Sequence, residues 1–322
     1  MMRKMLHAVC ATLALVASVA ACAQAWPAKP VRLIVSQAAG TSPDIAARLI
    51  AERLSRLWSQ PLVVENRAGG QNVIGAQAAA RAAPDGYTFF FATTAAIVTN
   101  PLTFKSLPYD PPRDFDAVGM IAKSPMVVAV GAAVPVKTLA ELVALDKSKP
   151  NTLSAAHEGP RTFSGMMSLA LNLSTGMQVL QVPYNGATPA IQDTIGGRTQ
   201  IVLLSSAAVA PFIKRGDLKP IAVTVGKRVA GLENVPTLAE TYPGFDYAGW
   251  FAVLAPAGTP REVVLRFNRD LNLVLADAEV AQRLRDLGLV LEPGTPEALN
   301  EFLAAERARW GKLVREIGLQ PE

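Results

Sequence analysis

The chain has little cysteine and little histidine, two residues of each in 322. Both cysteines, Cys10 and Cys22, fall in the first 25 residues together with His7, so the remainder has no thiol and one imidazole, His157. A disulfide framework is therefore excluded for that remainder. A zinc-type site, which draws on several His and Cys ligands, is disfavoured. We expect no cofactor and no metal.

Motifs of several enzyme and nucleotide-binding classes are also missing. The sequence has no Gly-x-Ser-x-Gly elbow, no Gly-x-x-x-x-Gly-Lys phosphate loop and no Gly-x-Gly-x-x-Gly after a strand pattern. A secreted hydrolase with a Ser-His-Asp triad would have to use His157, so we keep it only as an alternative.

The first 25 residues are typical of a secretory signal peptide. Arg3 and Lys4 precede an apolar run over residues 5–21, and residues 23–25 form an Ala-x-Ala cleavage signal. The run is short for a membrane span, which needs about 20 residues. A second interpretation takes Cys22 as the end of a lipobox and the site of a lipid anchor. Either interpretation predicts a periplasmic protein.

The charge of the remaining chain is mild. Loss of Arg3 and Lys4 leaves 29 of 31 basic residues against 26 acidic ones, a net charge of about +3. Without a basic run or an aromatic-interleaved basic patch, we expect no nucleic-acid partner. The 297 residues that follow residue 25 exceed one comfortable core, so two domains are predicted.

Residues 61–88 carry the most informative pattern. A short buried strand over Leu62–Glu65 is followed by the glycine pair at 69 and 70, an Ala-rich helix over 74–81, and a returning strand over 87–91. A strand-turn-helix-turn-strand unit normally places its strands parallel in an α/β sheet. Strand and helix patterns alternate along the rest of the chain, which also predicts an α/β fold.

This order of motifs resembles the Bug-type extracytoplasmic solute receptors, the substrate-binding proteins of tripartite tricarboxylate transporters. The matching segments, in family order, are Lys29–Val35, Pro61–Arg67, Pro84–Thr88, Leu107–Asp110, Val182–Gly186 and Ala255–Pro260. The resemblance implies a two-lobed periplasmic binding protein of type II-like fold with two crossing hinge strands. It also implies a receptor and no enzyme, with a small organic carboxylate as ligand and transporter membrane subunits as partners.

The lobes can be placed on the chain. Two apolar strand patterns, Val118–Val130 and Tyr247–Leu254, lie where a two-lobed receptor crosses between lobes. We therefore expect domain 1 over 26–120 plus 250–322 and domain 2 over 121–249. The cleft between lobes is a favoured ligand site, and crossing strands act as a hinge.

The resemblance places two loops as a pincer on the ligand carboxylate, each leading into a helix. A helix start leaves backbone N–H groups unpaired and carries partial positive charge, so it suits a carboxylate. Strand ends supply further candidates, because the carboxyl ends of strands in α/β sheets face the ligand crevice. The predicted ligand-binding residues are Gln37, Ala38, Ala39, Gly40, Thr41, Ser42 and Asp44 in the first loop, His157, Gly159, Arg161 and Thr162 in the second, and Thr93, Thr94, Tyr184, Asn185, Ser205 and Ser206 at strand ends. The alternative for each loop is an ordinary capped turn.

Both loops depart from the family pattern. The first keeps one glycine, Gly40, where the family has two or three, and a family histidine after the second loop is Gly165 here. Arg161 stands inside the second loop, where it could pair with a ligand carboxylate or simply be solvated. His157 could donate to the ligand or be an ordinary loop histidine.

Ser205 and Ser206 stand where the family often has Asp-Asn. That change removes a carboxylate which could hold a ligand amine, so we hypothesise a mono- or dicarboxylate ligand without a required ammonium. A sensing receptor that presents its ligand to a membrane signalling partner, such as a sensor kinase, would have the same sequence pattern and stays open. We expect the receptor to act as a monomer.

Overall fold

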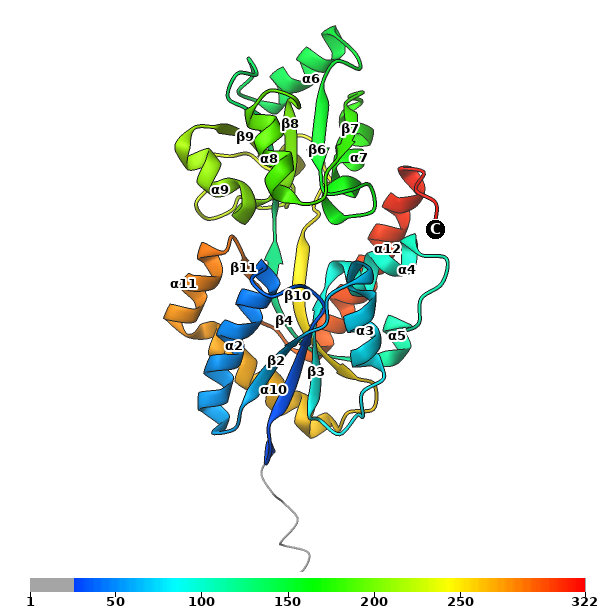
Figure 1. Cartoon of the computed structure of the whole chain (residues 1–322), viewed down its shortest axis with the longest axis vertical. Coiled ribbons are helices and arrows are strands. Elements are labelled where there is room, and N and C mark those ends of the chain that lie inside the picture. The colour runs from blue at the N-terminus through cyan, green and yellow to red at the C-terminus, as the bar shows by residue number, and fades with distance from the viewer. Residues whose placement is uncertain (1–25, 322) are drawn as a thin grey trace, which may run out of the picture.

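The computed structural model describes residues 26–321, which form two α/β bodies stacked end to end (Figure 1). The predicted signal peptide and the alternative lipid anchor at Cys22 lie outside the described residues. Between residues 26 and 321, no helix is long and apolar enough to cross a membrane.

The first body is built on a sheet with strand order β11-β4-β10-β3-β1-β2. Strands β1, β2 and β3 are parallel, whereas β10 runs antiparallel to both β3 and β4. The strands are β1 (Val31–Val35), β2 (Leu62–Asn66), β3 (Thr88–Thr93), β4 (Phe115–Ser124), β10 (Gly249–Pro256) and β11 (Val290–Leu291). The β2-α3-β3 unit, with α3 at Val73–Ala80, is the strand-helix-strand arrangement that residues 61–88 predict.

Both faces of this sheet are covered, and the sequence of β3 shows why. Phe89, Phe90 and Phe91 are all fully buried, and they alternate between two apolar cores on opposite faces. Helices α2 (Ser42–Trp58), α10 (Arg261–Ala276) and α11 (Ala278–Asp286) share one core. Helices α3 and α12 (Pro296–Glu316) share the other.

The second body is built on a sheet with strand order β7-β6-β8-β5-β9. Strands β6, β7 and β8 are parallel, and β5 runs antiparallel to β8 and β9. Its elements are β5 (Met126–Gly131), α6 (Leu139–Ser148), β6 (Ser154–His157), α7 (Phe163–Thr175), β7 (Leu180–Pro183), α8 (Ala187–Ile195), β8 (Ile201–Ser205), α9 (Ser206–Arg215) and β9 (Leu218–Val223). Short helical segments are η1 (Gly70–Asn72), η2 (Ala95–Thr99), α4 (Asn100–Thr103), α5 (Pro111–Asp114) and η3 (Leu238–Glu240).

In the described chain, two passages connect the bodies. The first continues β4 into β5 across Pro125, and the second enters β10 after the loop that follows β9. The long strand expected over Val118–Val130 is therefore two strands in two sheets, because proline has no N–H for a ladder at the junction. The prediction of a mixed α/β fold with two crossing strands is confirmed.

Helix α12 braces the second passage through a buried carboxylate. Glu306 is 1% exposed, and it accepts hydrogen bonds from the indole nitrogens of Trp250 (3.0 Å) and Trp310 (3.1 Å). Arg309 forms an ion pair with Glu306 and also donates to the Asp246 carbonyl, just ahead of β10. The helix therefore holds the start of β10 by charge as well as by packing.

This bracing generates a stability prediction. Glu306→Gln keeps the shape but removes the charge that balances Arg309, so the free energy of unfolding should fall by about 2–3 kcal/mol. Urea unfolding followed by circular dichroism measures it. Glu301→Gln, an exposed position on the same helix, is the matched control. Equal unfolding midpoints for the two variants would show that the cluster is not stabilising.

Candidate functional site

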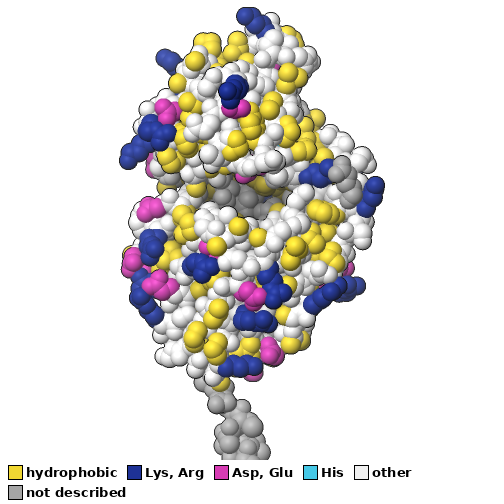
Figure 2. Space-filling view, in the orientation of Figure 1, with side chains coloured by type: hydrophobic (Ala, Val, Ile, Leu, Met, Phe, Trp, Pro, Cys, Tyr) yellow, Lys and Arg dark blue, Asp and Glu magenta, His cyan; other side chains and the backbone are white. Residues whose placement is uncertain are grey.

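The carboxyl ends of the parallel strands in both sheets point toward the other body. In the first sheet the end of β3 pairs with the start of β10, Thr93 with Phe251, where the chain has just arrived from the second body. In the second sheet the end of β8 pairs with the start of β5, Ser205 with Met126, directly after the passage from β4. The remaining parallel strands share these directions. Figure 2 shows the surface hollowed between the two bodies.

Helices begin at most of these strand ends. Within the described residues, α2, α3, α7, α8 and α9 follow β1, β2, β6, β7 and β8 respectively. Their starts bring unpaired N–H groups and partial positive charge to the region between the sheets. Thr162 and Ser205 cap α7 and α9 with their hydroxyls, whereas α2 and α8 begin without a side-chain cap in this part of the chain. Such a region favours an anion.

In the first loop, Asp44 is turned into its own body. The side chain is 2% exposed, and its carboxylate accepts from Gly40 N (2.8 Å), Asn66 Nδ2 (2.8 Å) and Arg48 Nε (3.1 Å). Burial alone would raise the pKa of Asp44, but these hydrogen bonds outweigh it and hold the pKa below its usual value. The carboxylate therefore fixes the loop's shape. A direct contact between Asp44 and the ligand stays a prediction.

The other candidates of the first body lie around the same strand ends. Gln37 Nε2 donates to Asn72 Oδ1 (2.7 Å) and to Thr93 Oγ1 (3.4 Å), so two predicted residues are brought together. Thr94 is engaged elsewhere, because its hydroxyl accepts from Trp250 N at 2.8 Å. Ala38, Ala39 and Gly40 are exposed at the tip of the loop, while Thr41 and Ser42 are half-buried at the start of α2.

A left-handed turn next to Gln37 was not anticipated. Gly70, Gln71 and Asn72 have φ angles of 54°, 52° and 77°, a conformation that costs free energy for the two residues with side chains. The turn is held from two sides, by Gln37 on Asn72 and by Asn100 Nδ2 on the Gln71 carbonyl (2.7 Å). The glycine pair signalled a turn and asparagine tolerates the left-handed conformation, but nothing in the sequence signalled that Gln71 adopts it as well.

In the second loop, His157 is 1% exposed at the end of β6. Its Nδ1 accepts from Gly159 N (3.0 Å), which places the proton of the neutral ring on Nε2. Among residues 26–321, Nε2 has no hydrogen-bond partner. Burial lowers the pKa of His157, which favours the neutral ring.

The second loop folds back onto the first turn of α7. A Cβ at Gly165 would lie 1.9 Å from the Gly159 carbonyl oxygen, so only glycine allows this close approach. Thr162 both caps the helix and donates to Gly159 O at 2.7 Å. The glycine that replaces a family histidine thus has a steric role in this chain.

Arg161 contacts the C-terminal segment of the chain. Its Nη2 donates to the Gln320 carbonyl (3.0 Å), in the segment after α12, and so ties the second body to the C-terminal region. Its pairing with a ligand carboxylate stays a prediction.

The strand-end candidates of the second body are largely engaged within the protein. Tyr184 Oη donates to Asp193 Oδ2 (2.9 Å), and Asn185 is exposed in the turn before α8. Ser206 Oγ bridges the bodies by donating to the Gly288 carbonyl (3.1 Å). Ser205 caps α9. Their direct ligand contacts likewise stay predictions.

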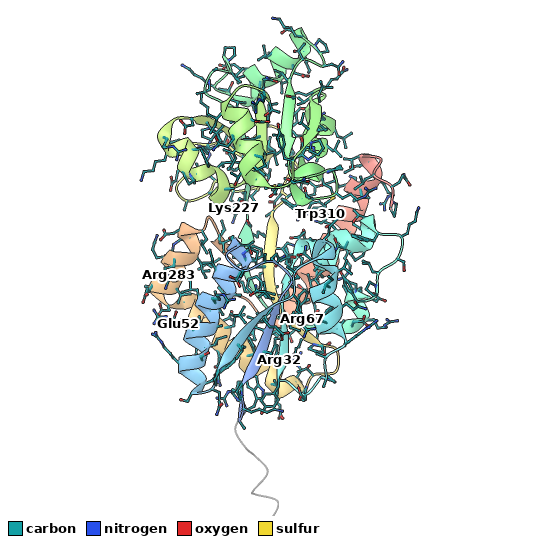
Figure 3. The ribbon with its side chains drawn as sticks, viewed as in Figure 1. Arg32, Glu52, Arg67, Lys227, Arg283 and Trp310 are labelled. Carbon is teal, nitrogen blue, oxygen red and sulfur yellow. The ribbon has the colours of Figure 1, made fainter. Side chains whose placement is uncertain are left out.

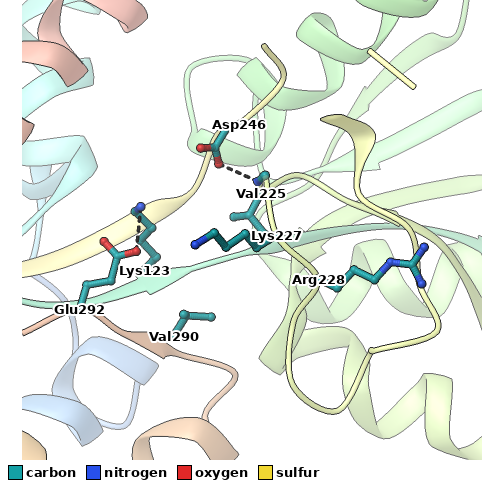
Figure 4. A pocket seen from close by; sticks show the side chains of 8 residues that line it. Lys123, Val225, Lys227, Arg228, Asp246, Val290 and Glu292 are labelled. Atoms are coloured by element: carbon teal, nitrogen blue, oxygen red, sulfur yellow. Dashed lines mark hydrogen bonds and ion pairs between the residues drawn. The ribbon is translucent and has the colours of Figure 1, made fainter. Parts of the chain in front are cut away.

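A pocket of about 180 Å³ lies at the hinge, lined from both bodies (Figure 4). Lys123 of β4 pairs with Glu292 at 2.9 Å on one side, and Lys227 and Asp246 come from the connection between β9 and β10. Figure 3 shows Lys227 and Trp310 on either side of the crossing strand β10. Sequence patterns gave no signal for this pocket. In the part of the chain that the structure describes, no three His, Cys, Asp or Glu side chains are placed to hold a metal ion.

Two α/β bodies, two crossing strands and helix starts facing one another define a two-lobed solute-binding protein. The family model described as "Tripartite tricarboxylate transporter family receptor" matches residues 46–319. A UPF0065 protein of Bordetella bronchiseptica is 36% identical over 302 residues, covering 94% of this chain and 90% of that protein. Protein BugT of Bordetella pertussis is 33% identical, with 92% and 91% covered. The chain belongs to the Bug-type receptors of the tripartite tricarboxylate transporter family.

Solved structures agree with this assignment. R. palustris Rpa4515 with adipate is 34% identical with a TM-score of 0.82, covering 92% of this chain and 100% of that one. MatC from Rhodopseudomonas palustris with bound malate is 28% identical with a TM-score of 0.76, covering 90% and 100%. The family and these neighbours are receptors and no enzymes, which confirms that prediction and retires the hydrolase alternative.

The Asp44 contacts generate a pH prediction. Because the folded pKa is depressed, the stabilisation is present above the ordinary aspartate pKa of about 4 and is lost as the pH falls through and below it. Asp44→Asn should lower the free energy of unfolding by about 1–2 kcal/mol at neutral pH and weaken its loss toward acid. Urea unfolding at several pH values measures both effects. The exposed Asp286→Asn should keep the wild-type profile, and an unchanged profile in Asp44→Asn would contradict the assignment.

Proposed function

We propose that this receptor binds a small organic carboxylate between its two bodies in the bacterial periplasm and presents it to the membrane subunits of a tripartite tricarboxylate transporter. The observation that carries the proposal is the meeting of helix starts from both sheets at one region. The adipate and malate in the two neighbour structures support a carboxylate ligand.

Lobe closure follows from the same arrangement. We infer the two predicted lobes, 26–120 plus 250–322 and 121–249, with the first junction moved to Pro125 because β4 stays in the first sheet through Ser124. The second junction is the approach to β10. A carboxylate that touches helix starts of both lobes binds the closed state more tightly, and therefore shifts the population toward closure. The transporter would then recognise the closed form, and a signalling partner could recognise the same form.

Charge on the ligand is the sharpest test. Isothermal titration of the unfolded and refolded 26–322 chain should show adipate or succinate binding at least about tenfold tighter than the corresponding diamide. The diamide has the same shape without the negative charge, so it is the matched control. Small-angle X-ray scattering should show a more compact protein with the acid. Equal affinity for acid and diamide would reject carboxylate recognition.

A further inference from the structure

Two adjacent side chains after β1 carry buried polar atoms without a hydrogen-bond partner among residues 26–321. They are the hydroxyl oxygen of Ser36, a residue 1% exposed, and the side-chain oxygen Oε1 of Gln37. A buried polar atom normally finds a partner, because leaving it unpaired costs free energy. These atoms lie just after β1, whose carboxyl end points toward the other lobe, so a bound ligand could supply the missing partners.

Both side chains lie at the start of α3. A Cβ on Gly75, in the first turn of that helix, would come within 2.7 Å of Ser36, so the two backbones are in close contact. Gln37 holds Asn72, the residue immediately before the helix. Helix α3 has no side-chain cap in the described chain. The Val73 N–H donates to the Gly70 carbonyl, which leaves the other N–H groups of the first turn, where Gly75 contacts Ser36. We call Ser36, Gln37 and the start of α3 the α3 subsite.

The α3 subsite contains both hydrogen-bond donors and a hydrogen-bond acceptor, so its atoms need different partners. The helix start and the Ser36 hydroxyl can both donate, which suits a carboxylate oxygen. Gln37 uses its Nε2 on Asn72 and Thr93, so it presents an oxygen that can only accept. A carboxylate cannot satisfy that oxygen at neutral pH. The ligand must therefore bring a donor next to its carboxylate.

A hydroxyl fits this requirement better than an ammonium. The partial positive charge at the start of α3 repels a cation. The nearby carboxylate of Asp44 cannot compensate, because Gly40, Arg48 and Asn66 already occupy it. Burying an ammonium without a counter-charge costs much more than burying a hydroxyl that finds an acceptor.

We propose that the α3 subsite recognises a 2-hydroxycarboxylate end. The carboxylate lies at the start of α3 and accepts from Ser36, while the hydroxyl on the neighbouring carbon donates to Gln37 Oε1. Ser36 contacts Gly75 and Gln37 holds Asn72, so both residues lie at the start of one helix. The inference rests on the proposed function and deepens it by naming the ligand class.

Matched ligands test the proposal on the wild-type protein. In isothermal titration of the refolded 26–322 chain, malate should bind about tenfold or more tightly than succinate, which lacks only the hydroxyl. Methoxysuccinate, whose ether oxygen cannot donate, should bind like succinate or more weakly. Aspartate, with an ammonium in the same place, should also bind more weakly than malate.

Variants assign the effect to its residues. Gln37→Met should weaken malate binding and bring the ratio of malate to succinate affinity close to one. Ser36→Ala should weaken both acids by a similar factor and keep the ratio. Gln181→Met is the control, because Gln181 also has a buried unpartnered Oε1 but lies on β7, ahead of the strand's carboxyl end. It should change neither affinity, and thermal melts check that each variant is folded.

The outcomes separate this inference from the proposed function. Equal binding of malate and succinate, both tighter than their diamides, would overturn the hydroxyl requirement while carboxylate recognition stands. Tighter binding of aspartate than of malate would make the donor an ammonium and overturn the proposal. A preference for malate that survives Gln37→Met would reject Gln37 as its cause. Failure of every acid to exceed its diamide would reject the proposed function itself.

Discussion

Strand direction at the two crossings is the constraint on which the site depends. Strand β4 of the first sheet runs directly into β5 of the second sheet, and β10 of the first sheet begins where the chain returns from the second body. The starts of β5 and β10 therefore both lie at the hinge. Antiparallel pairing then forces β3 and β8 to end there, and every strand parallel to them ends there too. The facing helix starts follow, since each helix begins where its strand ends. The directions of the crossing strands thus produce a region that favours an anion.

The buried Glu306 has a different kind of importance. A carboxylate that is 1% exposed is costly unless it is paired and hydrogen-bonded, and here Arg309 and two indole N–H groups supply both conditions. Trp250 stands at the start of β10 and Trp310 lies 5.2 Å from the Phe163 ring of α7, so the cluster touches both bodies. Helix α12 is therefore part of the hinge region as well as part of the core that it shares with α3.

The architecture was largely readable from the sequence, because its signals are local. The segment that becomes β2, α3 and β3 carries its glycines, its Ala-rich helix and its aromatic strand in order, and it folds accordingly. Individual side-chain partners were not readable, because they depend on residues far away in the chain. Arg161 meets Gln320, and Ser206 meets Gly288, only after both bodies have assembled. The left-handed Gln71 was likewise hidden, since glutamine, unlike asparagine, has no preference for that conformation and is held in it through the Asn100 side chain on its carbonyl.

The crossings also affect the order in which the two sheets can complete their strand pairing during synthesis. All strands of the second sheet lie in one continuous stretch, from Met126 to Val223, whereas β3 and β4 of the first sheet are joined only through β10, which begins at Gly249. During synthesis from the N-terminus, the second sheet can complete its pairing while the first still has an open gap beside a strand of three phenylalanines. The first sheet, whose first strands are synthesised earliest, therefore completes its pairing last. Until β10 is added, the edge of β3 has unpaired backbone groups that can pair with another chain.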